Sequence, residues 1–94
     1  MDLHKFPAPH SQVAARVVDG EAVVILADSG NVNVLNPVGT RIWELADGSR
    51  SVRQIADAIA AEYEVTPEGA LQDVTEFVQK LVEVHALTLQ DTPK

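Results

Sequence analysis

Hydrophobic and polar positions along the first third of the chain follow the alternation and turn signals of short strands. Asp19-Gly20 separates two apolar runs and is typical of a hairpin turn. Residues 28–31 give a second turn signal, and Pro37 ends strand character because proline has no backbone N–H to donate. The pattern predicts an antiparallel meander of three strands at residues 12–18, 21–27 and 32–35.

The rest of the chain changes to helical periodicity, and capping residues mark three helix starts. Asn36-Pro37 combines a preferred N-cap with a proline at the first helical position, and Thr66-Pro67 repeats this arrangement. Ser51 and Gln54 are spaced as a capping box. The predicted helices run from Pro37 to the Asp47-Gly48 stop, from Ser51 to Glu64, and from Pro67 to Val84.

Apolar side chains on the third predicted helix cover an unusually wide arc. A stripe of ~100° is enough for a helix that packs on one core, whereas these residues cover roughly 160°. Part of this helix face is therefore available for another role. The apolar residues are Ala70, Leu71, Val74, Phe77, Val78, Leu81, Val82 and Val84.

The 94 residues are enough for one domain with a modest core. Pro7, Pro9 and the lack of periodicity around them predict a flexible N-terminal arm at residues 1–11, followed by a domain at 12–89 and a frayed tail at 90–94. Within the domain we expect Trp43 at the edge of the core and residues 86–89 as an extended segment over its open end. The predicted fold class is α+β, a three-stranded antiparallel sheet followed by three helices, similar to a winged helix-turn-helix.

Composition and charge exclude several classes of partner. No apolar run approaches the roughly 18 residues of a membrane span, and the N-terminal residues lack a secretory signal, so we expect a cytoplasmic protein with no membrane partner. The formal charge is −7, and after Gln54 only Lys80 and Lys94 oppose the carboxylates. Nucleic-acid binding depends on lysine and arginine at phosphates, so we expect no nucleic-acid partner.

Candidate catalytic or ligand-binding residues do not converge in the sequence. The histidines, His4, His10 and His85, have no metal-binding spacing, and His85 is explained as a favourable partner for a helix C-terminus. Residues 28–31 lack the lysine and following helix of a phosphate-binding loop. Asp73 and Glu76 fit a solvated helix face. We therefore expect no catalytic residues, no metal and no cofactor.

The third predicted strand, residues 32–35, is the best candidate for a binding surface. It lies at an edge of the meander and carries none of the lysine, proline or inward charge that usually protects such an edge. A free strand edge beside a helix with surplus apolar surface suits β-augmentation, in which an incoming peptide adds a strand. Two alternatives stay open: the N-terminal arm covers this edge, or a second copy does so in a homodimer.

Several short motifs occur in a characteristic order, and with them the segment from about Val13 to Leu89 resembles the PqqD-like peptide chaperones, also called RiPP precursor recognition elements. The resemblance implies three antiparallel strands and three helices, in agreement with the periodicity. It also implies a non-catalytic protein that binds the leader of a ribosomally made precursor peptide and presents it to a modifying enzyme, often a radical-SAM protein. The motifs are Leu35-Asn36, Ile42-Trp43-Glu44-Leu45, Asp47-Gly48, Ser51-Val52 with Ile55, Asp73-Val74, Phe77-Val78 and Leu81.

The resemblance implies a peptide groove between the third strand and the third helix. This pairing agrees with the two surfaces that the patterns single out. Val34 stands where lasso-peptide relatives commonly have Tyr, and the Cys-Asp-Gly of pyrroloquinoline quinone chaperones is missing, so the pathway stays open. The alternative function is a winged-helix-like regulatory or interaction protein that binds a protein partner. The implied groove residues are Val32, Asn33, Val34, Leu35, Val74, Phe77, Val78 and Leu81.

Overall fold

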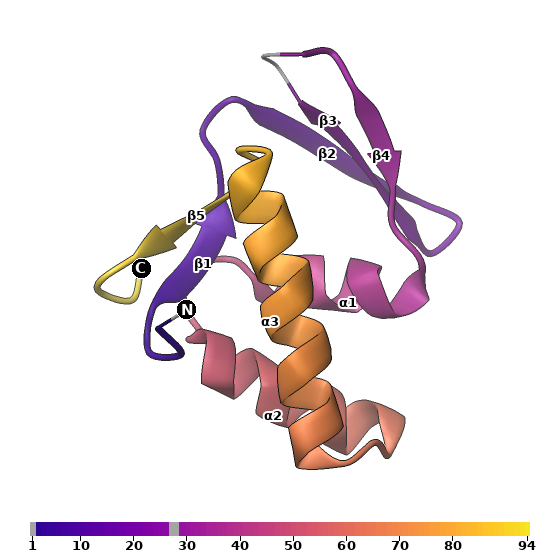
Figure 1. The fold of residues 1–94 in the computed structure, drawn as a ribbon. Coiled ribbons are helices and arrows are strands. Elements are labelled where there is room, and N and C mark those ends of the chain that lie inside the picture. The colour runs from indigo at the N-terminus through magenta and orange to yellow at the C-terminus, as the bar shows by residue number, and fades with distance from the viewer. Residues whose placement is uncertain (1, 27–28) are drawn as a thin grey trace.

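Two antiparallel sheets and three helices make up the part of the chain that the computed structural model describes, residues 2–26 and 29–94 (Figure 1). Ala27 of the expected second strand and Asp28 of the expected turn lie outside the described residues. The elements are β1 (Phe6–Pro9), β2 (Val13–Val18), β3 (Glu21–Leu26), β4 (Val32–Val34), α1 (Pro37–Leu45), α2 (Val52–Tyr63), α3 (Pro67–Glu83) and β5 (Leu87–Gln90).

The predicted α+β class with its three-stranded meander is confirmed. The larger sheet has the order β2-β3-β4, with β3 in the centre and antiparallel neighbours on both sides. Asp19 and Gly20 take positive φ angles in the turn between β2 and β3, as the Asp-Gly signal predicts. The core face of this sheet is formed by the buried side chains of Ala22, Val24 and Leu26.

All three helices begin at the predicted caps. The side chains of Asn36 and Thr66 accept hydrogen bonds from the N–H groups of Gly39 and Gly69, and a proline follows each cap. Ser51 and Gln54 form both hydrogen bonds of the capping box, so α2 begins as expected. The helix boundaries differ from the predicted ones only in the last residues and at the start of α2, where Ser51 is the cap and Val52 the first helical residue.

The N-terminal segment differs from the expected flexible arm, because β1 pairs with β5 in a two-stranded sheet. Its prolines are compatible with this pairing. The N–H of His10 donates to the Ala86 carbonyl, so alternation places the missing N–H positions of Pro7 and Pro9 on the side facing away from β5. Pro7 and Ala8 are buried, and regular structure begins at Phe6 instead of near residue 12.

Further contacts hold both ends of the chain against the helices. The carbonyls of Leu3 and Lys5 accept hydrogen bonds from the N–H groups of Arg53 and Val52, which have no partner within the first turn of α2. Lys5 also forms an ion pair with Asp91, and the Lys94 N–H donates to the Gly48 carbonyl. The segment predicted as a frayed tail at 90–94 therefore begins within β5 and contacts the loop after α1.

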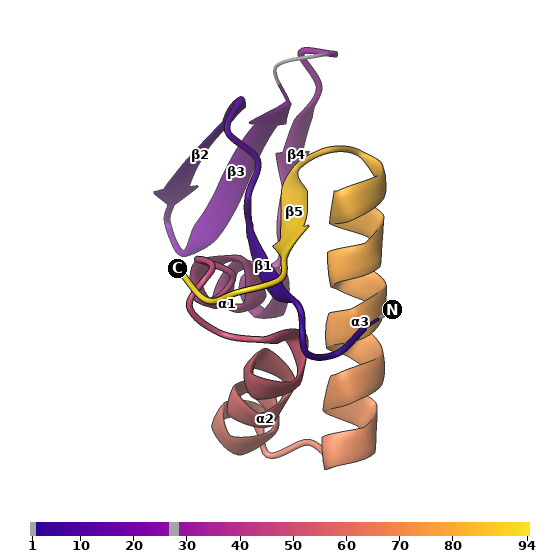
Figure 2. The same cartoon turned by 90° about the vertical axis from the view of Figure 1, so that its left-hand side faces the viewer.

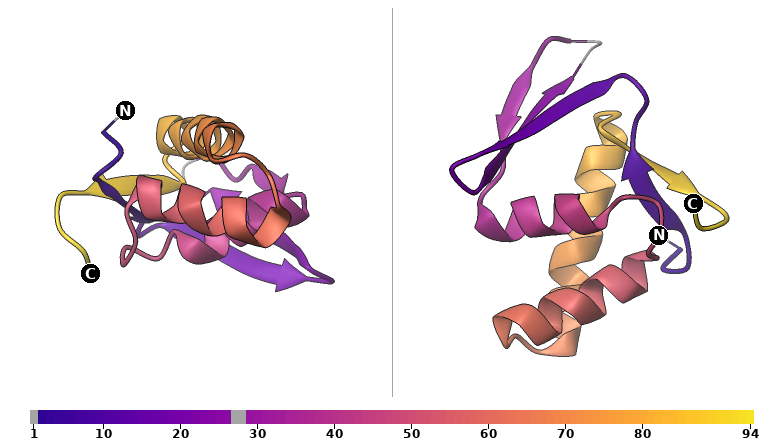
Figure 3. Two further views of the ribbon diagram at one scale, coloured as in Figure 1. Left: turned by 90° about the horizontal axis from the view of Figure 1, so that it is seen from below. Right: turned by 180° about the vertical axis from the view of Figure 1, so that it is seen from behind.

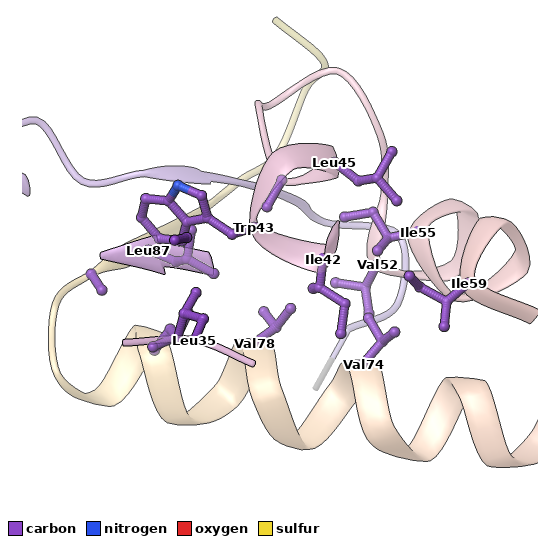
Figure 4. Packing of buried hydrophobic residues seen from close by; sticks show 14 of the residues in the cluster. Leu35, Ile42, Trp43, Leu45, Val52, Ile55, Ile59, Val74, Val78 and Leu87 are labelled. Carbon is purple, nitrogen blue, oxygen red and sulfur yellow. The ribbon is translucent and has the colours of Figure 1, made fainter. Parts of the chain in front are cut away.

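One hydrophobic core joins the helices to both sheets (Figure 4). Ile42 of α1, Ile55 of α2 and Val74 of α3 meet at its centre, and all three are at most 2% exposed. Trp43 is 9% exposed and lies beside Leu87 of β5, which fits the predicted position at the edge of the core. The extended segment 86–89 covers this end of the core as expected, since Ala86 and Leu87 are buried.

The helix α3 lies against α2 with its N-terminal half, and its C-terminal half extends toward the level of β5 and the larger sheet (Figures 1 and 2). The helix α1 lies between α2 and the larger sheet and packs against β3, as the view from behind also shows (Figure 3, right). This arrangement brings the end of β4 and the start of α1 next to the middle of α3.

Within residues 2–26 and 29–94, no helix is both long and apolar enough to cross a lipid bilayer.

Candidate functional site

The strand β4 presents a free backbone edge. Among the described strands it pairs with β3 alone, through the register Val23 with Val34, Val24 with Asn33 and Ile25 with Val32. The described part of the N-terminal arm does not cover this edge, because β1 pairs with β5. The first of the two alternatives for covering β4 is therefore wrong for residues 2–11.

The hydrogen bonds next to β4 fix which of its N–H groups face outward. The N–H of Leu35 donates to the Ala22 carbonyl at 2.8 Å, so Leu35 points its backbone groups toward β3. Because this direction alternates along a strand, Asn33 also points toward β3, whereas Val32 and Val34 point away from the sheet. The edge thus offers the N–H and C=O groups of Val32 and Val34 to an incoming strand.

A hollow of about 500 Å³ lies beside the end of β4. Its walls come from β4 and the linker after it, from the first half of α1, and from the middle of α3. This volume is within the range of roughly 300–1,000 Å³ typical of ligand sites. The lining residues are Val34, Leu35, Asn36, Val38, Gly39, Ile42, Asp73, Phe77 and Lys80.

Buried hydrogen bonds hold α1 in place at the floor of the hollow. The Thr40 hydroxyl donates to the Leu35 carbonyl at 3.2 Å and accepts from the Ala22 N–H at 2.8 Å. Thr40 is 4% exposed, so losing either bond would leave a polar group without a partner inside the protein. The Asn36 side chain caps α1 through the Gly39 N–H at 2.7 Å. The linker between β4 and α1 is therefore fixed at both ends.

The helical wall differs from the predicted one by a single residue step. Val74, Val78 and Leu81 were expected in the groove, but they are 0%, 0% and 5% exposed and belong to the core. Phe77, which was also predicted, does line the hollow, together with Asp73 and Lys80 of the neighbouring stripe of α3. Hydrophobic periodicity identifies the stripe that faces the core, and the core here takes the more apolar of the two.

The other predicted groove residues are brought together by the structure. Val32 and Val34 are 58% and 61% exposed, Asn33 is exposed, and Leu35 is buried at the base of the hollow. Phe77 is half-buried and faces the hollow, which accounts for part of the surplus apolar arc of α3. Strand and helix thus meet as expected, with Val34 and Leu35 on one side and Phe77 on the other.

Sequence reasoning did not assign the α1 residues of the hollow to the site. Val38 and Ile42 are spaced by one helical turn, and this spacing is explained by an apolar face of α1 that packs on the core. At the polar ends of the α3 wall, Asp73 was predicted to lie on a solvated helix face, and Lys80 was given no role in the predicted groove. The pattern Asp73, Phe77 and Lys80, with one aromatic residue between two charges at helical spacing, is typical of the boundary of a buried face and was the available signal.

Charged groups near the hollow are balanced, although the helical half of the chain is acidic. Asp73 and Lys80 lie on either side of Phe77 along α3, and both are exposed. Arg41 of α1 binds Glu62 of α2 through two hydrogen bonds, of 2.7 and 3.0 Å. These bonds lower the pKa of Glu62 and raise the pKa of Arg41 from their ordinary values. This ion pair joins α1 to α2, and neither of its residues lines the hollow.

The histidines and Glu76 are not among the residues that line the hollow. His10 and His85 have ring centroids 6.4 Å apart, and His85 follows the end of α3 with a positive φ angle. In the parts of the chain that the structure describes, no group of three or more His, Cys, Asp or Glu side chains is arranged to hold a metal ion. Asp73 and Glu76 are exposed on α3.

Comparisons with known proteins agree with this architecture. A family model described as "PqqD: Coenzyme PQQ synthesis protein D (PqqD)" matches residues 21–87. The solved structure "TbiB1 in Complex with the TbiA(beta) Leader Peptide" is similar with a TM-score of 0.79 and 30% identity, over 85% of this chain and 93% of that chain. The structure "Lasso peptide synthetase B1 complexed with the leader peptide" has the same TM-score at 22% identity, over 88% and 98%, and supports the fold. A comparison with curated proteins gave no match.

Proposed function

The chain belongs to the PqqD family, and on that premise we propose that it is a chaperone that binds the leader segment of a ribosomally made precursor peptide. The leader adds a strand to β4 and places alternate side chains in the hollow between β4, α1 and α3. One relative, 30% identical over most of the chain, was solved with a leader peptide. Because β-augmentation adds a strand to the sheet edge, the expected partner is a peptide in an extended conformation.

The observation that carries this proposal is the meeting of a free strand edge and an apolar hollow at the same place. The outward backbone groups of Val32 and Val34 supply hydrogen bonds that any extended peptide can use. Specificity then comes from side chains that enter the hollow and contact Val38, Ile42 and Phe77. Backbone pairing and a side-chain pocket together are the two parts of β-augmentation.

The charge distribution on α3 opposes the winged-helix alternative in its DNA-binding form. Four acidic residues of this helix are exposed, and Lys80 is its only basic residue. A helix of this charge would repel phosphates instead of releasing their counterions. The exposed acidic residues are Glu68, Asp73, Glu76 and Glu83.

We assign no chemistry to the chain itself and propose that a separate modifying enzyme, such as a radical-SAM protein, receives the bound peptide. The hollow is lined mainly by aliphatic and aromatic side chains, with Asp73 and Lys80 exposed at its helical wall. The lining residues include no Ser, Thr, Cys or His, so the hollow has no pair of a nucleophile and a base of the usual catalytic kind. These features suit a protein that binds a peptide and presents it to another enzyme.

The direct test is a titration of the purified chain with the leader of the precursor peptide encoded beside its gene. We expect saturable binding of the leader, followed by fluorescence anisotropy, and no binding of the core peptide alone. A labelled DNA duplex serves as the comparison ligand. Tight binding of the duplex at physiological salt, together with no binding of the leader, would contradict the proposal.

A further inference from the structure

Two helices of this chain begin with the same four-residue arrangement. In α1 the order is Asn36, Pro, Val and Gly39, and in α3 it is Thr66, Pro, Glu and Gly69. In both, the cap side chain accepts a hydrogen bond from the glycine N–H, at 2.7 Å for Gly39 and 3.1 Å for Gly69. The two glycines therefore have the same local role, and they differ only in what surrounds them.

Backbone conformation does not require glycine at position 39. Gly39 lies within α1 and, unlike Gly48, does not have a positive φ angle. Alanine would favour the helix at this position by about 1 kcal/mol over glycine. The consequence of a side chain at position 39 is therefore decided by the space around its Cα atom.

The surroundings of the two glycines separate the effect of the cap from the effect of the groove. A Cβ atom at Gly69 would meet only its own cap, the Thr66 Oγ1, at 3.0 Å. A Cβ atom at Gly39 would meet its cap, the Asn36 Oδ1, at 3.1 Å, and also the Phe77 ring at 3.0 Å. Crowding of the cap is common to both positions, whereas the contact with Phe77 belongs to Gly39.

We propose that Gly39 is a specificity-determining residue, because its missing side chain lets the Phe77 ring lie against α1 and keeps the hollow deep enough for a large apolar side chain of the leader. This inference rests on the proposed peptide-binding function. Any side chain at position 39 occupies the hollow directly or moves the Phe77 ring into it. We call the peptide residue whose side chain enters the hollow the anchor. Variants with a side chain at position 39 bind best to peptides with a smaller anchor.

The experiment uses a displayed library of random peptides as the probe. Binders are selected separately on the parent chain, on Gly39→Ala, on Gly39→Val and on Gly69→Ala, and thermal melts confirm that each variant is folded. We expect the parent and Gly69→Ala to select the same large apolar anchor. Gly39→Ala shifts the selection toward smaller anchors, and Gly39→Val shifts it further.

Affinities of synthesised binders give the second measurement. Gly39→Val is expected to weaken the parent-selected peptide by about tenfold or more, in line with the cost of small volume changes in an apolar pocket. In a Phe77→Leu background the same substitution costs less, because the smaller side chain leaves room for it.

The possible results separate the inference from the function on which it rests. If the parent chain selects no peptides and does not bind the neighbouring leader, the proposed function is wrong. If the parent selects a family of peptides and the Gly39 variants select the same family with equal affinity, the inference about Gly39 is wrong. The inference would also be contradicted if Gly39→Val lowered peptide affinity equally in the parent and in the Phe77→Leu variant. The loss would then not depend on the Phe77 ring.

Discussion

The two outer strands of the larger sheet, β2 and β4, differ in what lies beside them. Val13–Val18 is the longer edge, and its residues are exposed apart from Val13. A hollow of about 370 Å³ there is lined by residues of β2 and β3 alone. The shorter edge, Val32–Val34, adjoins a hollow that is also lined by α1 and α3. Both edges offer backbone hydrogen bonds, but only β4 offers a side-chain pocket formed with two helices.

This difference explains how β4, a strand of three residues, can discriminate between peptides. Backbone groups accept any extended peptide, so discrimination between peptides has to come from the side chains beside the edge. The side chains of Val38, Ile42 and Phe77 beside β4 can reject peptides that lack a fitting residue. If the account is right, substitutions on the β4 side change leader affinity, and matched substitutions on the β2 side do not.

The largest expected effect on stability is that of Asn33→Pro. The N–H of Asn33 points toward β3, so proline removes a bond of the sheet ladder and leaves an acceptor on β3 without a partner. We expect the free energy of unfolding to fall by about 1–3 kcal/mol. Chemical denaturation followed by circular dichroism measures this loss, and an unchanged midpoint would show that the register of β4 is wrong.

Phe77→Ala and Val78→Ala compare the two neighbouring stripes of α3. Phe77 faces the hollow, so its removal should weaken leader binding by about tenfold or more while the chain stays folded. Val78 is fully buried, so its truncation should lower stability by about 1–2 kcal/mol and leave the affinity of the folded protein near that of the parent.

Val18→Ala on β2 is the control for this pair, because Val18 is 48% exposed and lies at the other edge. It should change neither stability nor leader affinity. Equal losses of affinity for Phe77→Ala and Val18→Ala, measured by calorimetric titration, would remove the distinction between the two edges.

A smaller effect is expected from salt. The helical half of the chain has an excess of negative charge, so it should favour a neutral or basic leader segment. Raising the ionic strength from about 0.05 to about 0.5 M should weaken leader binding a few-fold, since exposed charges are screened. Binding that strengthens with salt would indicate that apolar contacts dominate and that the acidic surface repels the leader.

The smallest effect concerns the ion pair between Arg41 of α1 and Glu62 of α2. The Arg41 guanidinium lowers the pKa of Glu62 below its ordinary value of 4.5. A carboxyl whose pKa is lowered by folding stabilises the protein above its unfolded pKa, and this contribution is lost as the pH falls. The melting temperatures of the parent and Glu62→Gln should therefore differ at neutral pH and converge between about pH 5 and about pH 3. A difference that persists in acid would contradict the role of this pair.

The helix starts were predictable from the sequence because their determinants are local. Asn36, Ser51 and Thr66 each cap the helix that follows within a few residues, whatever the rest of the chain does. The pairing of β1 with β5 was not predictable, because it joins segments about 80 residues apart and Pro7 and Pro9 suggest disorder. Only the paired structure shows that both prolines lie on the side facing away from β5.

The candidate site was predictable in its elements and not in its details. The unprotected strand and the wide apolar arc of α3 indicated which elements form the groove. Periodicity cannot say how far α3 is rotated about its axis relative to the sheet, so Val74 and Val78 were assigned to the groove although they are core. The outward direction of Val34 likewise follows from the bond between Leu35 and Ala22, which joins residues distant in sequence.

The most direct test of the account is a pair of proline variants at outward-facing N–H positions, one on each edge. Val34 faces outward on β4, and alternation from the bonds of β3 makes Val17 face outward on β2. Val34→Ala controls for the loss of the side chain. Leader affinity is measured by titration for each variant, after melts show near-parental stability. We predict that Val34→Pro loses most of its leader affinity, whereas Val17→Pro and Val34→Ala keep theirs. A folded Val34→Pro that binds the leader as tightly as the parent would show that the peptide does not pair with β4.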